Sequence, residues 1–404
     1  MWLCFQLCFF VFNLILSNSF GSETPTLMVQ RLSKAQFEFS VNLYSQLAKQ
    51  SKENICFSPY SLASLLTMLY FGAEDNSRTE DQLKNVLNLN GLSQFEISNT
   101  TKFISHELST PFYQKFSGMA NGLLLDSSVL INHPYLEKVR KLFKADVFQI
   151  DFRNRMNLSG DLLHRWVKNQ TKLDFGLKLV TRNPKLVLLN VASLESKWLF
   201  PFNEYMTFEK GLFYVSSKER LEVPLMTGRF YLPLGYSVDL ECRVVELPFV
   251  SRRVSLFILL PDDMEGGLER LEASLNVETV KTLLSTLKDE NVNIRLPRIK
   301  LDVEVKMIDA LRELGLTNIF DDYGANFKEI NPNDHLHVSE IFHRTVIRIH
   351  ESSPESGNSL DMSNHIGAFG DKYFEVDHPF IFLVWDYPTG TALYLGRVVQ
   401  PDIT

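Results

Sequence analysis

Apolar residues recur at helical spacing in the first part of the chain. Phe37 and Val41 fall on one face of a helix expected over 29–49. The almost continuous apolar run at 61–72 predicts a buried helix, and Gly72 is placed to end it. Further helices are expected over 79–87, 94–108, 134–143, 162–169, 268–287 and 305–314.

Strand-like runs dominate the later part. The segment 186–198 is long and apolar enough for a strand that is buried on both faces. Shorter strands are expected over 54–59, 118–126, 208–214, 223–226, 229–234, 242–248, 254–260, 291–302 and 391–399. Because helices cluster early and strands late, the pattern predicts an α+β fold with large, mainly antiparallel sheets. No repeat or linker divides the chain, so one domain is expected over 22–404.

The stretch from His350 to Tyr373 interrupts this pattern. It is polar, rich in small residues and without helical period, and it lies between a strand-like run at 346–349 and an apolar run at 379–385. A loop of this length inside a compact domain is either functional or disordered. Strand signals on both sides favour a functional loop, which the rest of the chain presents.

Composition and motifs narrow the classes of function. The chain has 404 residues, of which 45% are hydrophobic and 22% charged, and this is ordinary for a globular protein. A net charge of −7 supplies no basic field for nucleic acid, and the basic runs at 138–141 and 252–253 are interpreted as solvated faces. Phosphate-binding loops, G-x-S-x-G and Cys-x-x-Cys are absent from the sequence. We therefore expect neither catalysis nor a metal site.

The first residues resemble a targeting segment. The run 7–16 is an apolar core of signal-peptide length and is too short to span a bilayer. Ser19 and Gly21 are small residues at suitable positions for cleavage ahead of Ser22, so a signal peptide is expected over 1–21 and the protein is predicted to be secreted and extracellular. An uncleaved anchor is the alternative, because no Lys or Arg precedes the apolar core. No later stretch predicts a membrane span.

Cysteines and glycosylation motifs agree with export. Cys56 and Cys242 would remain after cleavage, and their apolar, strand-like surroundings favour free buried thiols over a disulfide. Three N-x-Ser/Thr sequons begin at Asn99, Asn157 and Asn169 and are candidate glycosylation sites.

Several segments, taken in order, resemble the serpin family over about 32–401. They are 54–61 (NICFSPYS), 71–73, 189–202, 338–343, 377–380 and 389–399. The resemblance implies that shutter and breach positions of the central sheet are occupied by Ser58, Ser61, Asn190, Trp198 and His343.

The resemblance also implies a fold and a mechanism. Three mainly antiparallel sheets, about nine helices and an exposed reactive-centre loop over about 351–374 are expected. Inhibitory serpins are suicide substrates of serine proteases: the loop is cut, an acyl-enzyme forms, and the loop inserts as a new strand into the central sheet. The resemblance implies no cofactor. From the charge and the lack of a later long apolar stretch we expect no nucleic-acid or membrane partner, and we expect a monomer.

The hinge before the loop departs from the family pattern. With Glu351 as the hinge glutamate, Ser353 stands where a glycine is usual, and Pro354 replaces the usual Thr or Ser. Glu355 follows, and the usual alanine run begins instead at Ser356. Proline has no N–H for the ladder of a central strand. A non-inhibitory serpin that acts as a carrier, chaperone or binding protein is therefore the alternative to a protease inhibitor.

An inserted strand must alternate between buried and outward positions. Leu360 and Met362, the apolar pair of the loop, fall in the set that would be buried. The family's usual loop length places the reactive bond near Gly367–Ala368, or at Ala368–Phe369 after a slip of one residue. Small residues there suit an elastase-like protease, and Phe369 suits a chymotrypsin-like one.

Overall fold

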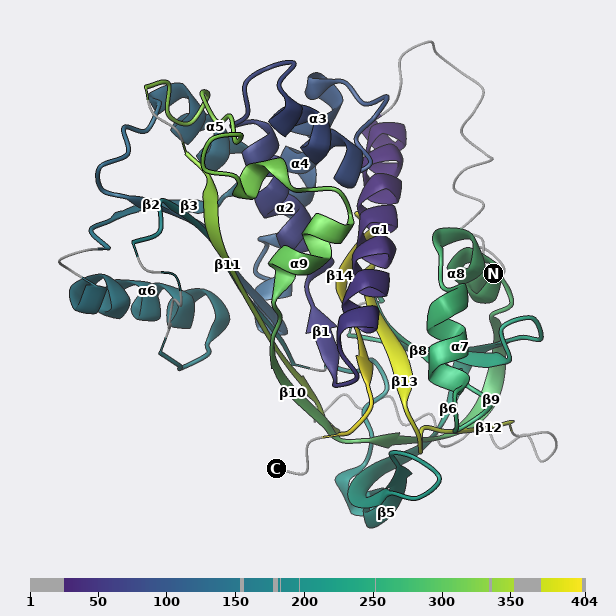
Figure 1. The fold of residues 1–404 in the computed structure, drawn as a ribbon. Coiled ribbons are helices and arrows are strands. Elements are labelled where there is room, and N and C mark those ends of the chain that lie inside the picture. The colour runs from purple at the N-terminus through teal and green to yellow at the C-terminus, as the bar shows by residue number, and fades with distance from the viewer. Residues whose placement is uncertain are drawn as a thin grey trace.

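The fold combines helices and two hydrogen-bonded sheets in a computed structural model (Figure 1). The structure describes residues 25–152, 156–176, 181, 183–195, 197–250, 252–333, 336–351 and 372–401. The α-helices of this part are α1 (Pro25–Gln50), α2 (Pro59–Tyr70), α3 (Arg78–Val86), α4 (Gln94–Leu108), α5 (His133–Phe143), α6 (Met156–Thr171), α7 (Gly267–Ser274), α8 (Val277–Ser285) and α9 (Met307–Glu313).

The central sheet is five-stranded, in the order β10-β11-β4-β2-β3. Its strands are β10 (Ile299–Glu304), β11 (Val338–Ile349), β4 (Leu186–Glu195), β2 (Ser117–Asp126) and β3 (Asp146–Ile150). Alternate residues face opposite layers: Leu186 and Leu188 join the core that contains α2, whereas Val187 and Leu189 pack against α6. β4 is therefore covered on both faces, as its apolar sequence predicts.

The second sheet is a nine-stranded network. Its order is β1-β14-β13-β8-β7-β6-β9-β12, and β5 pairs with β6 outside this path. The strands are β1 (Ile55–Phe57), β5 (Phe208–Tyr214), β6 (Arg220–Ser237), β7 (Cys242–Pro248), β8 (Val254–Pro261), β9 (Lys288–Pro297), β12 (Lys372–Glu375), β13 (Phe380–Asp386) and β14 (Thr391–Val398). Because the long β6 pairs with β5, β7 and β9, it joins two of the three expected sheets into one network.

Local chemistry divides two elements that the pattern predicted as single. The expected helix over 268–287 is two helices, α7 and α8, because the Asn276 side chain accepts the N–H groups of Glu278 and Thr279 and starts a new helix. The expected strand over 291–302 is split between the two sheets at Arg298: its N–H still bonds to Pro224 O of β6, the partner of β9, and the chain then enters the other sheet as β10 at Ile299.

Three further expectations differ from the structure. The expected strands over 223–226 and 229–234 are one strand, β6, and β4 ends at Glu195, before Trp198. Helix α2 ends at Tyr70, and Gly72 has no left-handed backbone. A Cβ at Gly72 would lie 2.5 Å from Ile330 Cγ1, so close packing accounts for this glycine.

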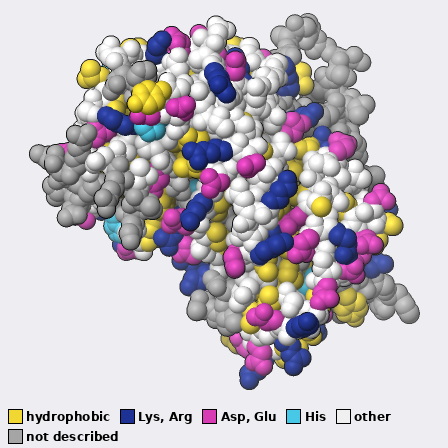
Figure 2. Space-filling model, in the orientation of Figure 1, with side chains coloured by type: hydrophobic (Ala, Val, Ile, Leu, Met, Phe, Trp, Pro, Cys, Tyr) yellow, Lys and Arg dark blue, Asp and Glu magenta, His cyan; other side chains and the backbone are white. Residues whose placement is uncertain are grey.

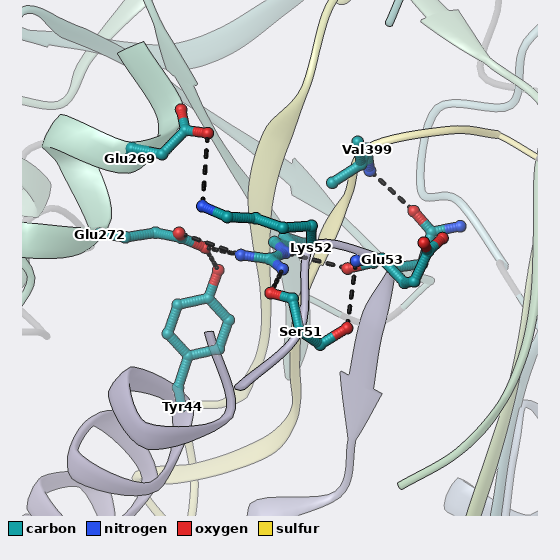
Figure 3. A network of polar contacts seen from close by, with 9 residues as sticks. Tyr44, Ser51, Lys52, Glu53, Glu269, Glu272 and Val399 are labelled. Atoms are coloured by element: carbon teal, nitrogen blue, oxygen red, sulfur yellow. Dashed lines mark hydrogen bonds and ion pairs between the residues drawn. The ribbon is translucent and has the colours of Figure 1, made fainter. Parts of the chain in front are cut away.

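A buried polar network ties the last strand to the first helix (Figure 3). Arg397 of β14 is 2% exposed and donates to the Glu272 carboxylate at 2.8 and 3.0 Å, and to the backbone oxygens of Ser51 and Glu53. The Tyr44 hydroxyl of α1 donates to the same carboxylate at 2.6 Å. Burial and the Glu272 charge raise the pKa of Tyr44, so the phenol stays protonated.

The remaining sequence features occupy ordinary positions. Cys56 and Cys242 are free and buried, as expected. Asn99 and Asn169 are exposed on α4 and α6, Asn157 lies in the first turn of α6, and glycosylation at the three remains a prediction. Within the described ranges no helix is both long and apolar enough to cross a bilayer, and no cluster of side chains could hold a metal ion. Residues 1–21 lie outside these ranges, so the signal peptide also remains a prediction.

Candidate functional site

The centre of the five-stranded sheet is a seam between β4 and β11. The two strands run parallel and pair directly, from Val187 opposite Glu340 to Glu195 opposite Arg348. The chain leaves β11 at Ile349 and resumes in the other sheet at Lys372. A segment that turned back after β11 and entered this seam would run antiparallel to both neighbours, which is a favourable arrangement for a new central strand.

A polar row crosses the seam within an otherwise apolar sheet. Asn121 of β2, Asn190 of β4 and His343 of β11 lie in register on three adjacent strands. The Asn190 amide donates to Asn121 Oδ1 at 2.6 Å. Below the row, Ser58 caps α2: its hydroxyl accepts the Ser61 N–H, while its own N–H donates to His343 Nε2 at 3.2 Å.

His343 and Asn190 each keep one buried polar atom without a hydrogen bond. Within the described residues, His343 Nδ1 and Asn190 Oδ1 have no partner. Burial lowers the pKa of His343 to about 3, so its ring is neutral, and because Nε2 accepts from Ser58, the proton lies on Nδ1. An unsatisfied buried polar atom costs about 1–3 kcal/mol. The closed seam is therefore less stable at this row than an apolar ladder would be.

Side chains close the end of the seam where β11 ends; we call this the upper end, and it lies at the bottom of Figure 1. Trp198 is buried against Phe202 and Phe249, and its Nε1–H donates to the His350 carbonyl at 2.7 Å. The His350 ring lies 3.2 Å from Glu195 Oε1, measured from Nε2. These contacts join the end of β4 to the first residue after β11.

The glutamate at the start of the loop is anchored. The Glu351 carboxylate is buried and receives Arg298 Nη2 at 2.7 Å, Arg298 Nε at 2.8 Å and the Thr207 hydroxyl at 2.5 Å. Burial by itself would raise the pKa of Glu351, but these donors outweigh it and hold the pKa below its usual range. The carboxylate is therefore charged at neutral pH and fixes the point where the chain departs from the sheet.

Some of the predicted site residues lie in the described part of the chain and others do not. Ser58, Ser61, Asn190 and His343 come together at the middle of the seam, and Trp198 and Glu351 lie at its upper end. The other predicted hinge residues and the reactive-bond residues lie outside the described part of the chain: Ser353, Pro354, Glu355, Ser356, Gly367, Ala368 and Phe369.

Sequence reasoning missed the partners that hold these residues. Arg298 and Thr207 bind Glu351, and the Glu195–His350 pair closes the upper end. Each contact joins residues far apart in the chain, and no periodicity marks such pairs. Arg298 offered one local signal, since a cation directly after a strand and a proline breaks the apolar pattern.

A closed parallel seam, a buried tryptophan at its end and an anchored glutamate directly after β11 together define an α+β scaffold built on two sheets. The family model for "Serpin (serine protease inhibitor)" matches residues 34–401, and the chain belongs to the serpin family. The α+β fold with nine helices in the described residues is thereby confirmed as the serpin fold.

The similar proteins include protease inhibitors and a serpin that does not inhibit proteases. The chain is 26% identical to a leukocyte elastase inhibitor of Xenopus laevis and 28% identical to macrophage plasminogen activator inhibitor 2 of Mus musculus. Each alignment covers 92% of this chain and 100% of the relative. The solved structure of uncleaved ovalbumin matches with a TM-score of 0.82 and 26% identity, over 92% of this chain and 100% of ovalbumin. Family members that are similar to this chain thus include protease inhibitors and the non-inhibitory ovalbumin.

The comparisons overturn the prediction of a secreted, extracellular protein. The leukocyte elastase inhibitors and plasminogen activator inhibitor 2 that it resembles are intracellular serpins, and their similarity brings no evidence for a signal peptide. The prediction of secretion was therefore wrong: a short apolar run near the N-terminus is not sufficient evidence that a chain is exported.

Proposed function

We propose that this protein inhibits a serine protease as a suicide substrate. The protease serine would attack the scissile carbonyl of the loop, form an ester bond and release the amino group of the following residue. The freed end of the loop would then enter the seam between β4 and β11 as a new strand. The protein itself would catalyse nothing, in line with its membership of a family of inhibitors.

The parallel pairing of β4 and β11 is the observation that carries this proposal. A chain segment that follows β11 can fill this seam with antiparallel pairing on both sides, and the entering backbone would bring donors and acceptors close to the unsatisfied atoms of His343 and Asn190. The similarity to inhibitors of elastase supports a serine-protease partner. Gly367, Ala368 and Phe369 favour an elastase-like or chymotrypsin-like enzyme.

The distribution of charged side chains on the surface does not point to another class of partner. On the face shown in Figure 2, Lys and Arg side chains alternate with Asp and Glu and form no large patch of one sign. This agrees with a net charge of −7 and does not favour a nucleic-acid partner.

The alternative is a serpin whose sheet does not accept its loop. Pro354 would remove a ladder donor, and Asn358 would need partners inside the sheet. The similarity to ovalbumin is compatible with this alternative. In that case the scaffold would serve as a carrier, chaperone or binding protein.

Cleavage of the loop separates the two functions. We would cut the loop between Asn364 and Tyr373 with any available protease and compare thermal unfolding of intact and cut protein. Inhibition predicts a large rise in the unfolding midpoint, because the loop adds a central strand, and an SDS-resistant complex with an elastase-type or chymotrypsin-type enzyme. An unchanged midpoint and cleavage without a complex would support the alternative.

A further inference from the structure

The lower end of the seam, away from the loop, is irregular. Pairing between β11 and β4 shifts by one residue between Val338 and Glu340, so Ser339 forms a β-bulge. A bulge interrupts the ladder and redirects the side chain of its extra residue. At this point Ser339 faces the segment that leads into β4.

Four hydrogen-bonding residues connect that segment to β11 and form what we call the basal clasp: Thr181, Lys185, Ser339 and Glu340. The Lys185 N–H donates to Ser339 Oγ at 2.9 Å, and the Thr181 N–H donates to Glu340 Oε2 at 2.8 Å. The Thr181 hydroxyl also donates to the Ser339 carbonyl, at 3.4 Å. Lys185 directly precedes β4, so the basal clasp joins β11 to the start of β4 at the point where the regular ladder is interrupted.

On the β11 side, contacts of His337 also hold the basal clasp in place. His337 Nε2 lies 3.3 Å from Ser339 Oγ, and His337 Nδ1 lies 2.9 Å from Asp322 Oδ1. Beside these residues is a cavity of about 200 Å³, which Asn183, Arg312 and Phe320 also line. Leu186 and Val338 pair with each other at this end and are buried in the core, while the cavity leaves the opposite side of the basal clasp open, so its hydrogen bonds add to the strand pairing where packing is one-sided.

We propose that the basal clasp controls completion of strand insertion. A strand that fills only the upper seam leaves it intact, whereas a strand that fills the whole seam must separate Lys185 from Ser339. Ser339 and Glu340 are thus positioning residues that act on the last step of insertion. This inference rests on the proposed loop-inserting function.

The first experiment adds a synthetic loop peptide, residues 352–364, to the full chain. Ser339→Ala should speed incorporation of the peptide about fivefold, the equivalent of one lost hydrogen bond. Ser237→Ala is the matched control, because the Ser237 hydroxyl also accepts a backbone N–H, from Leu240, but lies in the other sheet. An equal rate for Ser339→Ala and wild type would overturn the proposal. Glu340→Ala repeats the test should the first variant fold poorly.

A second measurement distinguishes failure of the basal clasp inference from failure of the proposed loop insertion. Hydrogen exchange of the intact protein should rise at 185–188 in Ser339→Ala and stay unchanged at 192–195. Unchanged exchange at 185–188, or an equal rise at both ends, would show that the basal clasp does not hold the lower seam. If the wild-type protein takes up no peptide, the inserting function fails, while the exchange comparison still decides whether the clasp holds the strands together.

Discussion

Arg298 holds Glu351, with 2.7 Å between Arg298 Nη2 and Glu351 Oε1, at the point where the chain leaves the central sheet. Arg298 lies between β9 and β10, which belong to different sheets. The ion pair therefore fixes the start of the reactive loop to the junction of the two sheets. Insertion of the loop, as proposed above, would require the Arg298–Glu351 contact either to survive or to rearrange.

Replacement of Arg298 by Leu should destabilise the native state. Glu351 is 4% exposed at its side chain and would lose its charged partner, so we expect a loss of about 1–3 kcal/mol in the free energy of unfolding, measured with urea at pH 7. The matched control is Arg295→Leu, whose partner Glu375 is 45% exposed and which should cost less than about 1 kcal/mol. Equal losses for the two variants would contradict a special role for the hinge pair.

Acid should weaken the same contact. The pKa of Glu351 is lowered in the folded state, so its stabilisation is complete above the ordinary glutamate range and is lost as the pH falls through the lowered pKa. Wild type should therefore lose more stability than Arg298→Leu on acidification below about pH 4.5. Parallel pH curves would show that the pair contributes nothing.

His343 should add a second acid sensitivity at higher pH. Its folded-state pKa is lowered to about 3 by burial, whereas the unfolded chain takes up this proton near pH 6.5. Stability is thus lost as the pH falls from 6.5 towards 3, by roughly 2–3 kcal/mol at pH 4.5. His343→Gln should flatten the pH dependence of unfolding over this range, whatever its stability at pH 7. A slope identical to that of wild type would refute the assignment.

The hinge proline should limit insertion. Pro354→Thr restores a backbone donor, so we expect fewer molecules of inhibitor to be consumed per protease and a larger rise in unfolding midpoint after loop cleavage. Ser353→Thr, on the outward-facing set, is the control and should change neither quantity. If Pro354→Thr behaves as wild type, the proline is not the obstacle.

The strand register of the loop has its own test. Leu360→Glu places a charge in the set that would be buried, and it should abolish the rise in midpoint after cleavage. Asp361→Glu, one residue along in the outward set, is the control and should keep the rise. A rise that persisted in Leu360→Glu would mean that the opposite set is buried.

Breaking the network in Figure 3 should reduce the free energy of unfolding more than breaking the Arg298–Glu351 pair does. Arg397→Met leaves the Glu272 carboxylate buried without its cation, so a loss of about 3–5 kcal/mol is expected in chemical unfolding. Lys52→Met, which removes an exposed pair with Glu269 at 3.8 Å, is the control and should cost less than about 1 kcal/mol. Adding Glu272→Gln to Arg397→Met should recover part of the loss. No recovery would place the effect in packing rather than charge.

Patterns within the sequence were sufficient to predict the α+β class of fold and to single out the polar stretch after Ile349. Local apolar periodicity is sufficient for α2, β4 and β8, because each buries one continuous run, and the polar stretch after Ile349 stands out against it. The resemblance to the serpin family assigned Ser58, Asn190, Trp198 and His343 to the shutter and breach, and these roles stay predictions. The structure brings Ser58, Asn190 and His343 together.

The contacts between distant residues could be read from the folded structure but not from the sequence. The parallel register of β4 and β11, the Arg298–Glu351 pair and the basal clasp join segments that are far apart in the chain, and no local pattern records such contacts. The same reason explains the missed division of β9 from β10, because an apolar run looks alike whether it serves one sheet or two. Local periodicity shows which residues are buried. Which neighbouring element buries them is set by the packing of the whole chain.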